Sequence, residues 1–328
     1  MSLILAGDIG GTHTRLALFE PGHVREPRLL RVYASSAHAG LAALVETYLR
    51  ECGSEAQRVT RAVFGAAGPV EKNVARVTNL PWVVDAEALR VRLKLERVRV
   101  INDFEAVCRA VPGLDAGDLH SLGGEAPSPD APIVVLGAGT GLGQGVLLPD
   151  SGGWRVVPSE GGHVEFAPHD ALGRRLLHYL AQRFPRVTWE RVLGGAALSH
   201  LYAFLRDREG VGENPALVPR MRTEDPAAVI TQQGGTGQDL LCARTLELYA
   251  TLYGSLAGNL VLTSLARGGV YLAGGIAPRI LPVLAGGAFR AGFNAKEQFS
   301  EFMARVPAWV IIHPQPGLMG AALAAEEA

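Results

Sequence analysis

The chain is poor in cysteine, in aromatic residues and in net charge. Only 3 of its 328 residues are cysteines, and Cys52, Cys108 and Cys242 lie far apart without a C-x-x-C pair. This pattern argues against disulfides and against a cysteine zinc site, and it predicts a reducing compartment. Because the formal net charge is −1 and no basic run is interleaved with aromatic residues, we expect no nucleic-acid partner.

Targeting and membrane signals are also missing. The first residues contain no basic region and no cleavage site, so we expect no signal peptide and a cytoplasmic protein. One uncharged segment, residues 249–266, approaches the length that spans a bilayer, but Glu247 and Arg267 flank it closely. It also contains small and polar residues: Thr251, Gly254, Ser255, Gly258, Asn259, Thr263 and Ser264. Its leucines fall near helical spacing, so we expect a buried helix that packs closely through its small residues and no membrane span.

Glycine is abundant, and it gathers in two similar turns. The chain has 40 glycines, and the runs LILAGDIGGTHTRLALFE (3–20) and IVVLGAGTGLGQGVLLPD (133–150) each predict a strand, a loop of Gly and Thr, and a second strand. Such a loop presents backbone N–H groups where no side chain blocks a phosphate. One copy is typical of an ordinary hairpin turn. Two copies favour an ATP-using enzyme with a duplicated core, in which both hairpins hold one triphosphate.

Neither loop matches the commoner nucleotide motifs. A Walker loop requires a lysine after its last glycine, and none follows either cluster. A Rossmann loop requires a glycine where this chain has Leu142, and it opens a helix, whereas the residues after Leu142 resemble a strand. We therefore expect the hairpin type of phosphate site.

The expected elements repeat in the same order twice along the chain, which is long enough for two domains. Strands are expected at 3–8, 14–20, 28–34, up to 66, 74–78 and 97–101, with helices at 40–51, 85–95 and from 103. After a loop at 123–132, we expect strands at 132–137, 143–148 and 154–158, a helix capped by Asp170 and a helix at about 188–206. There follow an irregular stretch at 207–237, the buried helix, strands at 268–275 and 308–314, and helices from 278 and 317. This order indicates two α/β domains built on related sheets.

Three polar positions stand out as candidates for chemistry. Asn102 and Asp103 come where an apolar strand ends and a helix begins, so they are either helix N-caps or, for the carboxylate, a general base at the carboxyl end of a strand. Glu190 opens another helix, where the helix dipole alone would favour a solvent-facing glutamate.

The segment SEGGHVE (159–165) forms the other candidate cluster. We expect Gly161 and Gly162 to let the backbone bend, so that Glu160 and His163 turn toward one point. A metal site is one interpretation, since His163 and Glu165 are ligand types, but no cysteine or further histidine follows at ligand spacing. A polyol site fits better, because carboxylates accept hydroxyl hydrogen bonds and a histidine adds a donor.

Together these segments resemble one family. DIGGTHTR, TNLPW, INDF, GAGTGLG, EGGHVEFAP, ERVLGG and GGVYLAGGIAPR occur in the order and approximate spacing of bacterial glucokinases of the type without a zinc motif. That family belongs to the actin-like ATPase superfamily, and the similarity extends from Leu3 to the terminal helix. The resemblance implies an α/β fold of two domains with a duplicated actin-like ATPase (ribonuclease H-like) core, its mixed sheets flanked by helices. The small domain is expected at 1–113 plus 314–328 and the large one at 114–313, with the active site in the cleft between them.

The resemblance also implies an activity and a set of site residues. It implies phosphorylation of glucose at the 6-hydroxyl by ATP, with Mg²⁺ as cofactor and a homodimeric enzyme. Asp103 would be the base, and the sugar ligands would be Asn102, Asp103, Glu160, His163 and Glu190. Asp8 would organise Mg²⁺ through water. The nucleotide would contact Asp8, Gly10, Gly11, Thr12, Thr140, Gly141, Gly274 and Gly275.

The chain departs from the family pattern at two places. Family members often have Ser-Gly-Pro where this chain has Gly194, Gly195 and Ala196, and residues 207–237 do not align clearly. The cysteine cluster of the related zinc-bearing sugar kinases is missing after His163, so we expect no bound zinc.

Other functions remain open. A kinase for another hexose, such as fructose or an amino sugar, would use the same fold. A sugar-sensing regulator is expected to carry a helix-turn-helix ahead of the first strand, which begins here at Leu3. An actin-like filament or chaperone ATPase would have no evident use for the five proposed sugar ligands.

Overall fold

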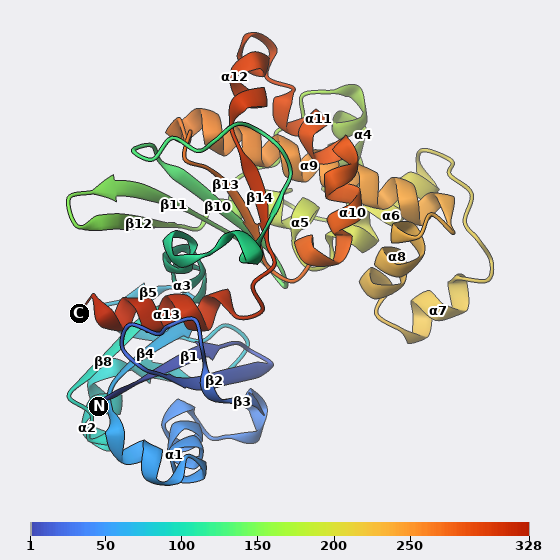
Figure 1. The fold of residues 1–328 in the computed structure, drawn as a ribbon. Helices are drawn as coiled ribbons and strands as arrows, with labels where there is room; N and C mark the ends of the chain where they lie inside the picture. The colour runs from blue at the N-terminus through green and yellow to red at the C-terminus, as the bar shows by residue number, and fades with distance from the viewer. Residues whose placement is uncertain (1, 328) are drawn as a thin grey trace. The chain divides into compact units, whose positions relative to one another are not determined.

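The structure is a computed structural model that describes residues 2–327, and it divides into two compact units. The first unit comprises the chain up to Asp115, Val156–Pro158 and the segment from His313 onward. The second unit comprises Ala116–Arg155 and Ser159–Ile312. Each unit has its own sheet, and Figure 1 labels their elements.

The first unit is built on a five-stranded sheet in the order β3-β2-β1-β4-β8. Its strands are β1 (Leu3–Ile9), β2 (His13–Phe19), β3 (Arg28–Ala34), β4 (Val59–Ala66) and β8 (Arg97–Asn102). β1, β2 and β3 pair antiparallel, whereas β4 pairs parallel with both β1 and β8. A small antiparallel sheet lies beside it, formed by β5 (Val70–Glu71), β6 (Val74–Arg76) and β7 (Val83–Asp85).

Helices cover both faces of the first sheet, which explains why β1 is apolar at nearly every position. Leu3 and Leu5 belong to one core cluster with residues of α1 (Leu41–Glu51) and α2 (Ala86–Leu93). Ile4 and Ala6 belong to another with residues of α3 (Asp103–Ala110) and α13 (Pro316–Glu326). Figure 1 shows these two pairs of helices on opposite sides of the sheet. Successive side chains of a strand point to opposite faces, so burial on both faces requires an unbroken apolar run.

The second unit is built on a six-stranded sheet in the order β12-β11-β10-β13-β14-β9. Its strands are β9 (Leu119–Ser121), β10 (Ile133–Ala138), β11 (Leu142–Asp150), β12 (Gly153–Ser159), β13 (Gly269–Ala273) and β14 (Ala308–Ile311). β10 pairs antiparallel with β11 and parallel with β13, which pairs parallel with β14. In the first unit, β1 likewise pairs antiparallel with β2 and parallel with β4, which pairs parallel with β8. The two sheets thus share one pairing pattern, as the predicted duplicated core requires.

The helices of the second unit centre on α9 (Leu240–Ser264), the long buried helix that the sequence predicted. The others are α4 (Ala171–Ala181), α5 (Trp189–Leu193), α6 (Ala197–Asp207), α7 (Val218–Thr223), α8 (Pro226–Gly235), α10 (Leu281–Val283), α11 (Phe289–Asn294) and α12 (Ser300–Arg305). Small residues bring α9 and α11 into backbone contact. A Cβ at Gly254 would lie 1.9 Å from the Phe289 carbonyl oxygen, and one at Gly292 would lie 2.0 Å from that of Thr251.

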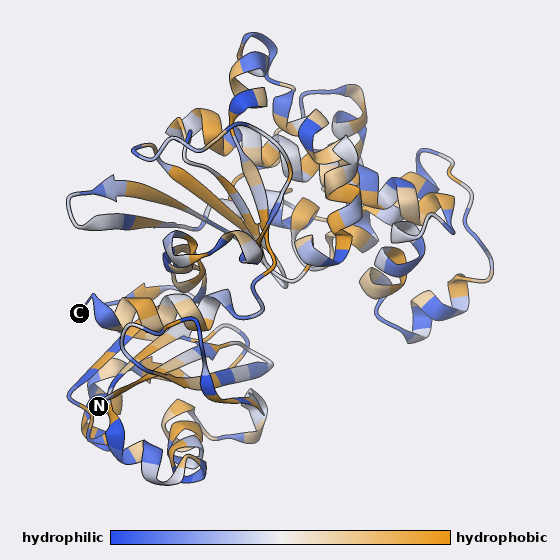
Figure 2. Ribbon diagram, in the orientation of Figure 1, coloured by the Kyte–Doolittle hydropathy of each residue, from blue (hydrophilic) through white to orange (hydrophobic). Residues whose placement is uncertain are grey.

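Helix α9 contains charged and small residues that a lipid-facing helix rarely has. Figure 2 shows hydrophilic and hydrophobic positions mixed along it, while strands β10 and β13 are largely hydrophobic. Within residues 2–327, no helix combines the length and the apolar content that a bilayer span needs.

Two expectations about the second unit were wrong. The helix expected at 188–206 is broken into α5 and α6, because the chain becomes extended at Gly194. The stretch 207–237, expected to be irregular, contains α7 and α8. Pro226 is the first residue of α8, and Asp225 caps that helix by accepting a hydrogen bond from the Ala227 N–H. Proline is favoured at the first helical position, so the high content of glycine, proline and charge did not exclude helices here.

Candidate active site

The first glycine loop (residues 10–12) connects β1 to β2 and lies beside an ion pair. Asp8 stands opposite Arg15 in the antiparallel ladder, and Arg15 Nη1 lies 3.3 Å from Asp8 Oδ2. Burial raises the pKa of Asp8 above its usual value, and Arg15 only partly opposes this shift. Cross-strand neighbours on one face of a sheet lie within contact distance, so the register of the hairpin creates this pair.

The first loop is held by backbone contacts. The Gly10 N–H donates to the His13 carbonyl at 3.0 Å, which closes the turn. At Gly11, a Cβ would lie 3.1 Å from the Thr78 carbonyl oxygen and 3.4 Å from the Asn79 Cβ. The segment TNLPW therefore lies against the first glycine loop. A Cβ at Gly317, at the start of α13, would lie 3.8 Å from the carboxyl carbon of Asp8.

Asn102 and Asp103 have different positions at the start of α3. Asn102 is the N-cap, and its Oδ1 accepts from the N–H groups of Phe104 (2.9 Å) and Glu105 (3.2 Å). Its amide nitrogen donates to the Gly68 carbonyl at 3.0 Å. Asp103 is the first helical residue, and its Oδ1 also lies 2.9 Å from the Phe104 N–H. The capping interpretation therefore holds for Asn102, and the helix does not depend on Asp103 as its cap.

Asp8 and Asn102 lie at the same edge of the first sheet. Asp8 pairs with Gly65 across β1 and β4, and Gly65 pairs with Ile101 across β4 and β8. Because these strands run parallel, their carboxyl ends meet at one edge, which is where α/β sheets bind ligands. Asp103 follows directly, and a Cβ at Gly65 would lie 3.4 Å from the Asp103 Cα.

The second glycine loop (residues 139–141) is the counterpart of the first, between β10 and β11. The Gly139 N–H donates to the Gly141 carbonyl at 2.9 Å, and the Thr140 carbonyl accepts from the Gly195 N–H at 3.0 Å. A Cβ at Gly195 would lie 2.7 Å from the Thr140 oxygen. The GGA sequence that departs from the family pattern therefore packs directly on the second loop.

Gly274 and Gly275 follow β13, the parallel neighbour of β10, and so lie at the same edge of the second sheet as the second loop. Gly274 has a φ of 84°, and a Cβ there would lie 2.3 Å from the Ala138 carbonyl oxygen. That backbone conformation and that close approach both require glycine.

Glu160, His163 and Glu190 come together in the second unit. His163 Nε2 lies 4.0 Å from Glu160 Oε2, and His163 Nδ1 lies 4.0 Å from Glu190 Oε1. The side chains of Glu160 and His163 are largely exposed, whereas that of Glu190 is mostly covered. Glu190 does not face solvent as a first-turn glutamate would, because its Oε2 accepts from the Leu142 N–H at 3.1 Å. Carboxylates around an imidazole supply the donors and acceptors that a sugar hydroxyl needs.

The two glycines of this turn have a different role from the one expected. They are not needed for bending, since neither has a positive φ. A Cβ at Gly161 would lie 1.0 Å from Gln144 Nε2, and one at Gly162 would lie 2.1 Å from the Leu142 carbonyl oxygen. At Gly162 glycine is required because the turn lies directly on the backbone of β11.

The comparisons with known proteins agree with the motifs. The glucokinase family model matches residues 5–328. A glucokinase of Nostoc punctiforme is 40% identical over 342 aligned residues, with 99% of each chain covered. The chain belongs to the glucokinase family. A glucokinase of Chromobacterium violaceum is 38% identical, covering 97% of this chain and 88% of its own length.

Solved structures show the glucokinase fold. A glucokinase from an Antarctic psychrotroph has a TM-score of 0.85 at 29% identity, with 100% of both chains covered. The glucokinase of Balamuthia mandrillaris, determined in complex with glucose, has a TM-score of 0.82 at 22% identity and shares the fold. The predicted family and the α/β fold class of actin-like sugar kinases are thus confirmed, and the chain is an enzyme of the glucokinase type.

One candidate ligand has another partner in the structure, and several contacts near the motifs were not predicted from the sequence. Glu165, considered as a metal ligand, forms an ion pair with Arg186. Within residues 2–327, no three His, Cys, Asp or Glu side chains gather so as to hold a metal ion. The contacts of Arg15, Leu142 and Gln144 were not expected. Of these contacts, only the Asp8–Arg15 pair could have been predicted from the sequence, because the register of a short hairpin places the two residues opposite each other.

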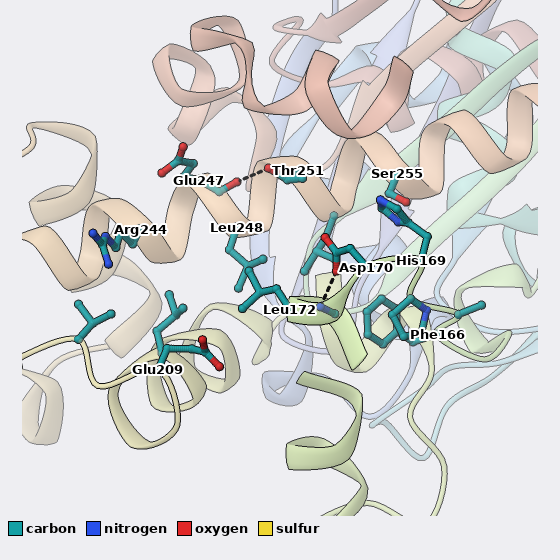
Figure 3. A pocket seen from close by; sticks show the side chains of 16 residues that line it. Phe166, His169, Asp170, Leu172, Glu209, Arg244, Glu247, Leu248, Thr251 and Ser255 are labelled. Carbon is teal, nitrogen blue, oxygen red and sulfur yellow. Dashed lines mark hydrogen bonds between the residues drawn. The ribbon is translucent and has the colours of Figure 1, made fainter. Parts of the chain in front are cut away.

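A large cavity of the second unit lies elsewhere. It has a volume of about 390 Å³, and Figure 3 shows it between the start of α4 and the middle of α9, with Asp170, Leu172, Leu248 and Thr251 on its walls. None of the glucokinase site residues named above lines it.

Proposed function

We propose that the chain transfers the γ-phosphoryl group of ATP to the 6-hydroxyl of glucose, with Asp103 as the general base. Full-length membership of the glucokinase family supports ATP-dependent phosphorylation of glucose. The observation that carries the choice of base is the position of Asp103, directly after β8 and at the start of α3. Asn102 is the N-cap of α3, and the Asp103 carboxylate follows it at the carboxyl edge of the sheet, where α/β sheets bind ligands.

The proposed base fits the chemistry of phosphoryl transfer. The transition state is loose, so positioning and charge neutralisation matter more than a strong base. The Asp103 carboxylate would accept the hydroxyl proton as the new O–P bond forms.

The sugar would be bound by side chains of both units. Asn102 and Asp103 would contribute from the first unit, and Glu160, His163 and Glu190 from the second. The proposal therefore has glucose bound between the units, which would close on the sugar and exclude the water that competes as phosphoryl acceptor. Several hydroxyl contacts would also reject sugars that lack one, since an unpaired buried polar group costs about 1–3 kcal/mol.

The nucleotide would be held by the two glycine loops. Gly10, Gly11 and Thr12 would face the phosphates from one sheet and Thr140 and Gly141 from the other, with Gly274 and Gly275 beside the adenosine. Asp8 fits a role in binding Mg²⁺ through water, because it offers one hard oxygen ligand and Mg²⁺ keeps most of its waters. When bound, the ion neutralises charge on the β- and γ-phosphates.

One assay tests the function. Purified protein is incubated with ATP, Mg²⁺ and a panel of hexoses that includes glucose, fructose, mannose and glucosamine, and ADP release is coupled to a dehydrogenase. We expect the highest kcat/KM with glucose. A higher kcat/KM with another hexose would contradict the assignment of the substrate, and no turnover with any of them would contradict the assignment of the activity.

The remaining expectations are a homodimer, which rests on the family resemblance, and a cytoplasmic location, which is supported by three cysteines that lie far apart. Light scattering coupled to size-exclusion chromatography measures the oligomer directly. A mass equal to one chain of 34.7 kDa would contradict the homodimer.

A further inference from the structure

The turn that carries Glu160 and His163 is capped by a residue outside it. The turn is Gly161–His163 (η5), and it is closed by hydrogen bonds from His163 N to the Glu160 carbonyl (3.0 Å) and from Val164 N to the Gly161 carbonyl (3.1 Å). The first N–H groups of any helical turn need an acceptor from elsewhere. Glu160, in the N-cap position, makes no side-chain cap bond. The Gly161 N–H donates instead to Ser159 Oγ at 2.9 Å.

Gln144 holds that capping hydroxyl in place. It lies on β11, next to β12, the strand that ends at Ser159. Its Nε2 donates to Ser159 Oγ at 3.1 Å. The oxygen of Ser159 thus accepts two hydrogen bonds, which occupies both of its lone pairs. Because Ser159 accepts the capping hydrogen bond, the Glu160 carboxylate is not needed as the cap and can bind a ligand.

The amide of Gln144 also touches the turn itself. It occupies the space where a Cβ of Gly161 would be, with Nε2 1.0 Å and Cδ 2.1 Å from that position. Displacement of Gln144 would therefore remove both a hydrogen bond to Ser159 and the surface on which the Gly161 backbone lies.

Glutamine at position 144 lowers the stability of the folded state. Its Oε1 is buried and has no hydrogen-bond partner among the described residues. A buried acceptor without a partner destabilises the folded state, and an apolar side chain of similar shape would remove that penalty. Local violations of this kind are expected at functional sites.

We propose that Gln144 and Ser159 are positioning residues of the sugar site, which fix the orientation of Glu160 and His163 without contacting the substrate. This inference rests on the proposed function, because it assumes that Glu160 and His163 bind the sugar. It predicts that Gln144 affects sugar binding and stability in opposite directions, which a merely structural residue does not do.

The test uses Gln144→Met and Ser159→Ala. Methionine keeps the length of the side chain and removes both polar atoms. For each variant we expect KM for glucose to rise about tenfold, the effect of about one lost hydrogen bond. KM for ATP should change by less than about twofold, because the turn is not part of either glycine loop. The melting temperature of Gln144→Met should equal or exceed that of the wild type.

Three further variants serve as controls. Ser159→Thr keeps the hydroxyl at an exposed position and should restore KM for glucose. Ser151→Ala removes an exposed hydroxyl from the turn between β11 and β12 and should match the wild type. The double variant Gln144→Met/Ser159→Ala should have the same KM for glucose as Ser159→Ala alone, since Gln144 acts on the turn through Ser159.

The outcomes separate the two hypotheses. An active wild type whose folded Gln144→Met and Ser159→Ala variants keep the wild-type KM for glucose would overturn the positioning role alone. A parallel rise in both KM values together with a lower melting temperature would also overturn it, in favour of general destabilisation. A wild type that phosphorylates no hexose would overturn the proposed function and the positioning role with it.

Discussion

Glu190 Oε2 accepts a hydrogen bond of 3.1 Å from the backbone N–H of Leu142, the residue that follows the second glycine loop. The same carboxylate lies 4.0 Å from His163 through its other oxygen, and a Cβ at Gly141 would lie 2.8 Å from Oε2. One side chain thus connects the proposed phosphate loop with the proposed sugar-binding turn. We infer that Glu190 supports the second glycine loop and also belongs to the proposed sugar site.

Glu190→Ala should therefore weaken the binding of both substrates, whereas Glu190→Gln should weaken that of glucose alone. Glutamine keeps a carbonyl oxygen that can accept from Leu142, but it loses the negative charge near His163. Steady-state kinetics should show higher KM values for ATP and glucose in the alanine variant, by about tenfold each if one hydrogen bond is lost. Equal KM values for ATP in the alanine variant and the wild type would contradict the role of Glu190 in the second glycine loop.

Asp103→Asn should abolish turnover, leave the fold intact and leave glucose binding largely intact. Loss of a general base typically lowers the rate by about 10²–10⁴. Because Asn102 is the cap of α3, the melting temperature should not change. The measurements are kcat and a glucose titration by Trp fluorescence. A folded variant that keeps more than about a tenth of the wild-type kcat would show that Asp103 is not the base.

Asn102→Ala is the complementary variant, and it should mainly affect stability. It removes two hydrogen bonds to helix N–H groups and one to the Gly68 carbonyl. Loss of an N-cap lowers the free energy of unfolding by about 0.5–2 kcal/mol. Denaturant unfolding should show this loss, and KM for glucose should rise because Asn102 is also a proposed sugar ligand. Unchanged stability would contradict the capping role.

Gly195→Ala should raise KM for ATP more than KM for glucose. A Cβ at this position would lie 2.7 Å from the Thr140 carbonyl oxygen, so the second glycine loop has to move. Gly152→Ala is the matched control, since a Cβ there meets nothing within 4 Å. If both substitutions leave KM for ATP unchanged, the second loop does not hold the nucleotide.

Asp8→Asn should inactivate the enzyme without lowering its stability at neutral pH. Burial raises the pKa of Asp8, so the folded state holds this proton more tightly than the unfolded chain does. Stability therefore falls as pH rises from about 3.9 through the folded pKa, and the ionised carboxylate is unfavourable above it. The melting temperature of the variant should equal or exceed that of the wild type at pH 7, and the difference should shrink toward pH 4. A clearly lower melting temperature at pH 7 would show that the Arg15 pair outweighs burial.

Glucose without nucleotide should make the protein more compact. The proposed ligands belong to both units, and a ligand that contacts both shifts the population toward the arrangement in which it does so. Small-angle scattering should show a smaller radius of gyration at saturating glucose, and Glu190→Ala should weaken the response. An unchanged radius and unchanged Trp fluorescence at saturation would argue against closure as the means of excluding water.

The sequence by itself determined the elements whose signals are local. Strand β10 is a continuous apolar run, and β1 is one up to Asp8. The glycine loops follow these strands directly, and the N-caps Asn102 and Asp170 bond to N–H groups only two or three residues away. Such signals depend on a few neighbouring residues, so they can be recognised in a short segment without knowledge of the rest of the chain. The family motifs and the α/β fold class were therefore predictable.

Only the tertiary structure decided which side chains meet. Between α5 and α6 the chain is extended at Gly194, and the Gly195 N–H donates to the carbonyl of Thr140, which is distant in the sequence. The Glu190–Leu142 bond spans 48 residues. The contact of Gln144 with Ser159 depends on the register of neighbouring strands, and a slip of one residue would turn Gln144 to the other face of the sheet. These relationships are set by long-range packing, and no local pattern in the sequence encodes them.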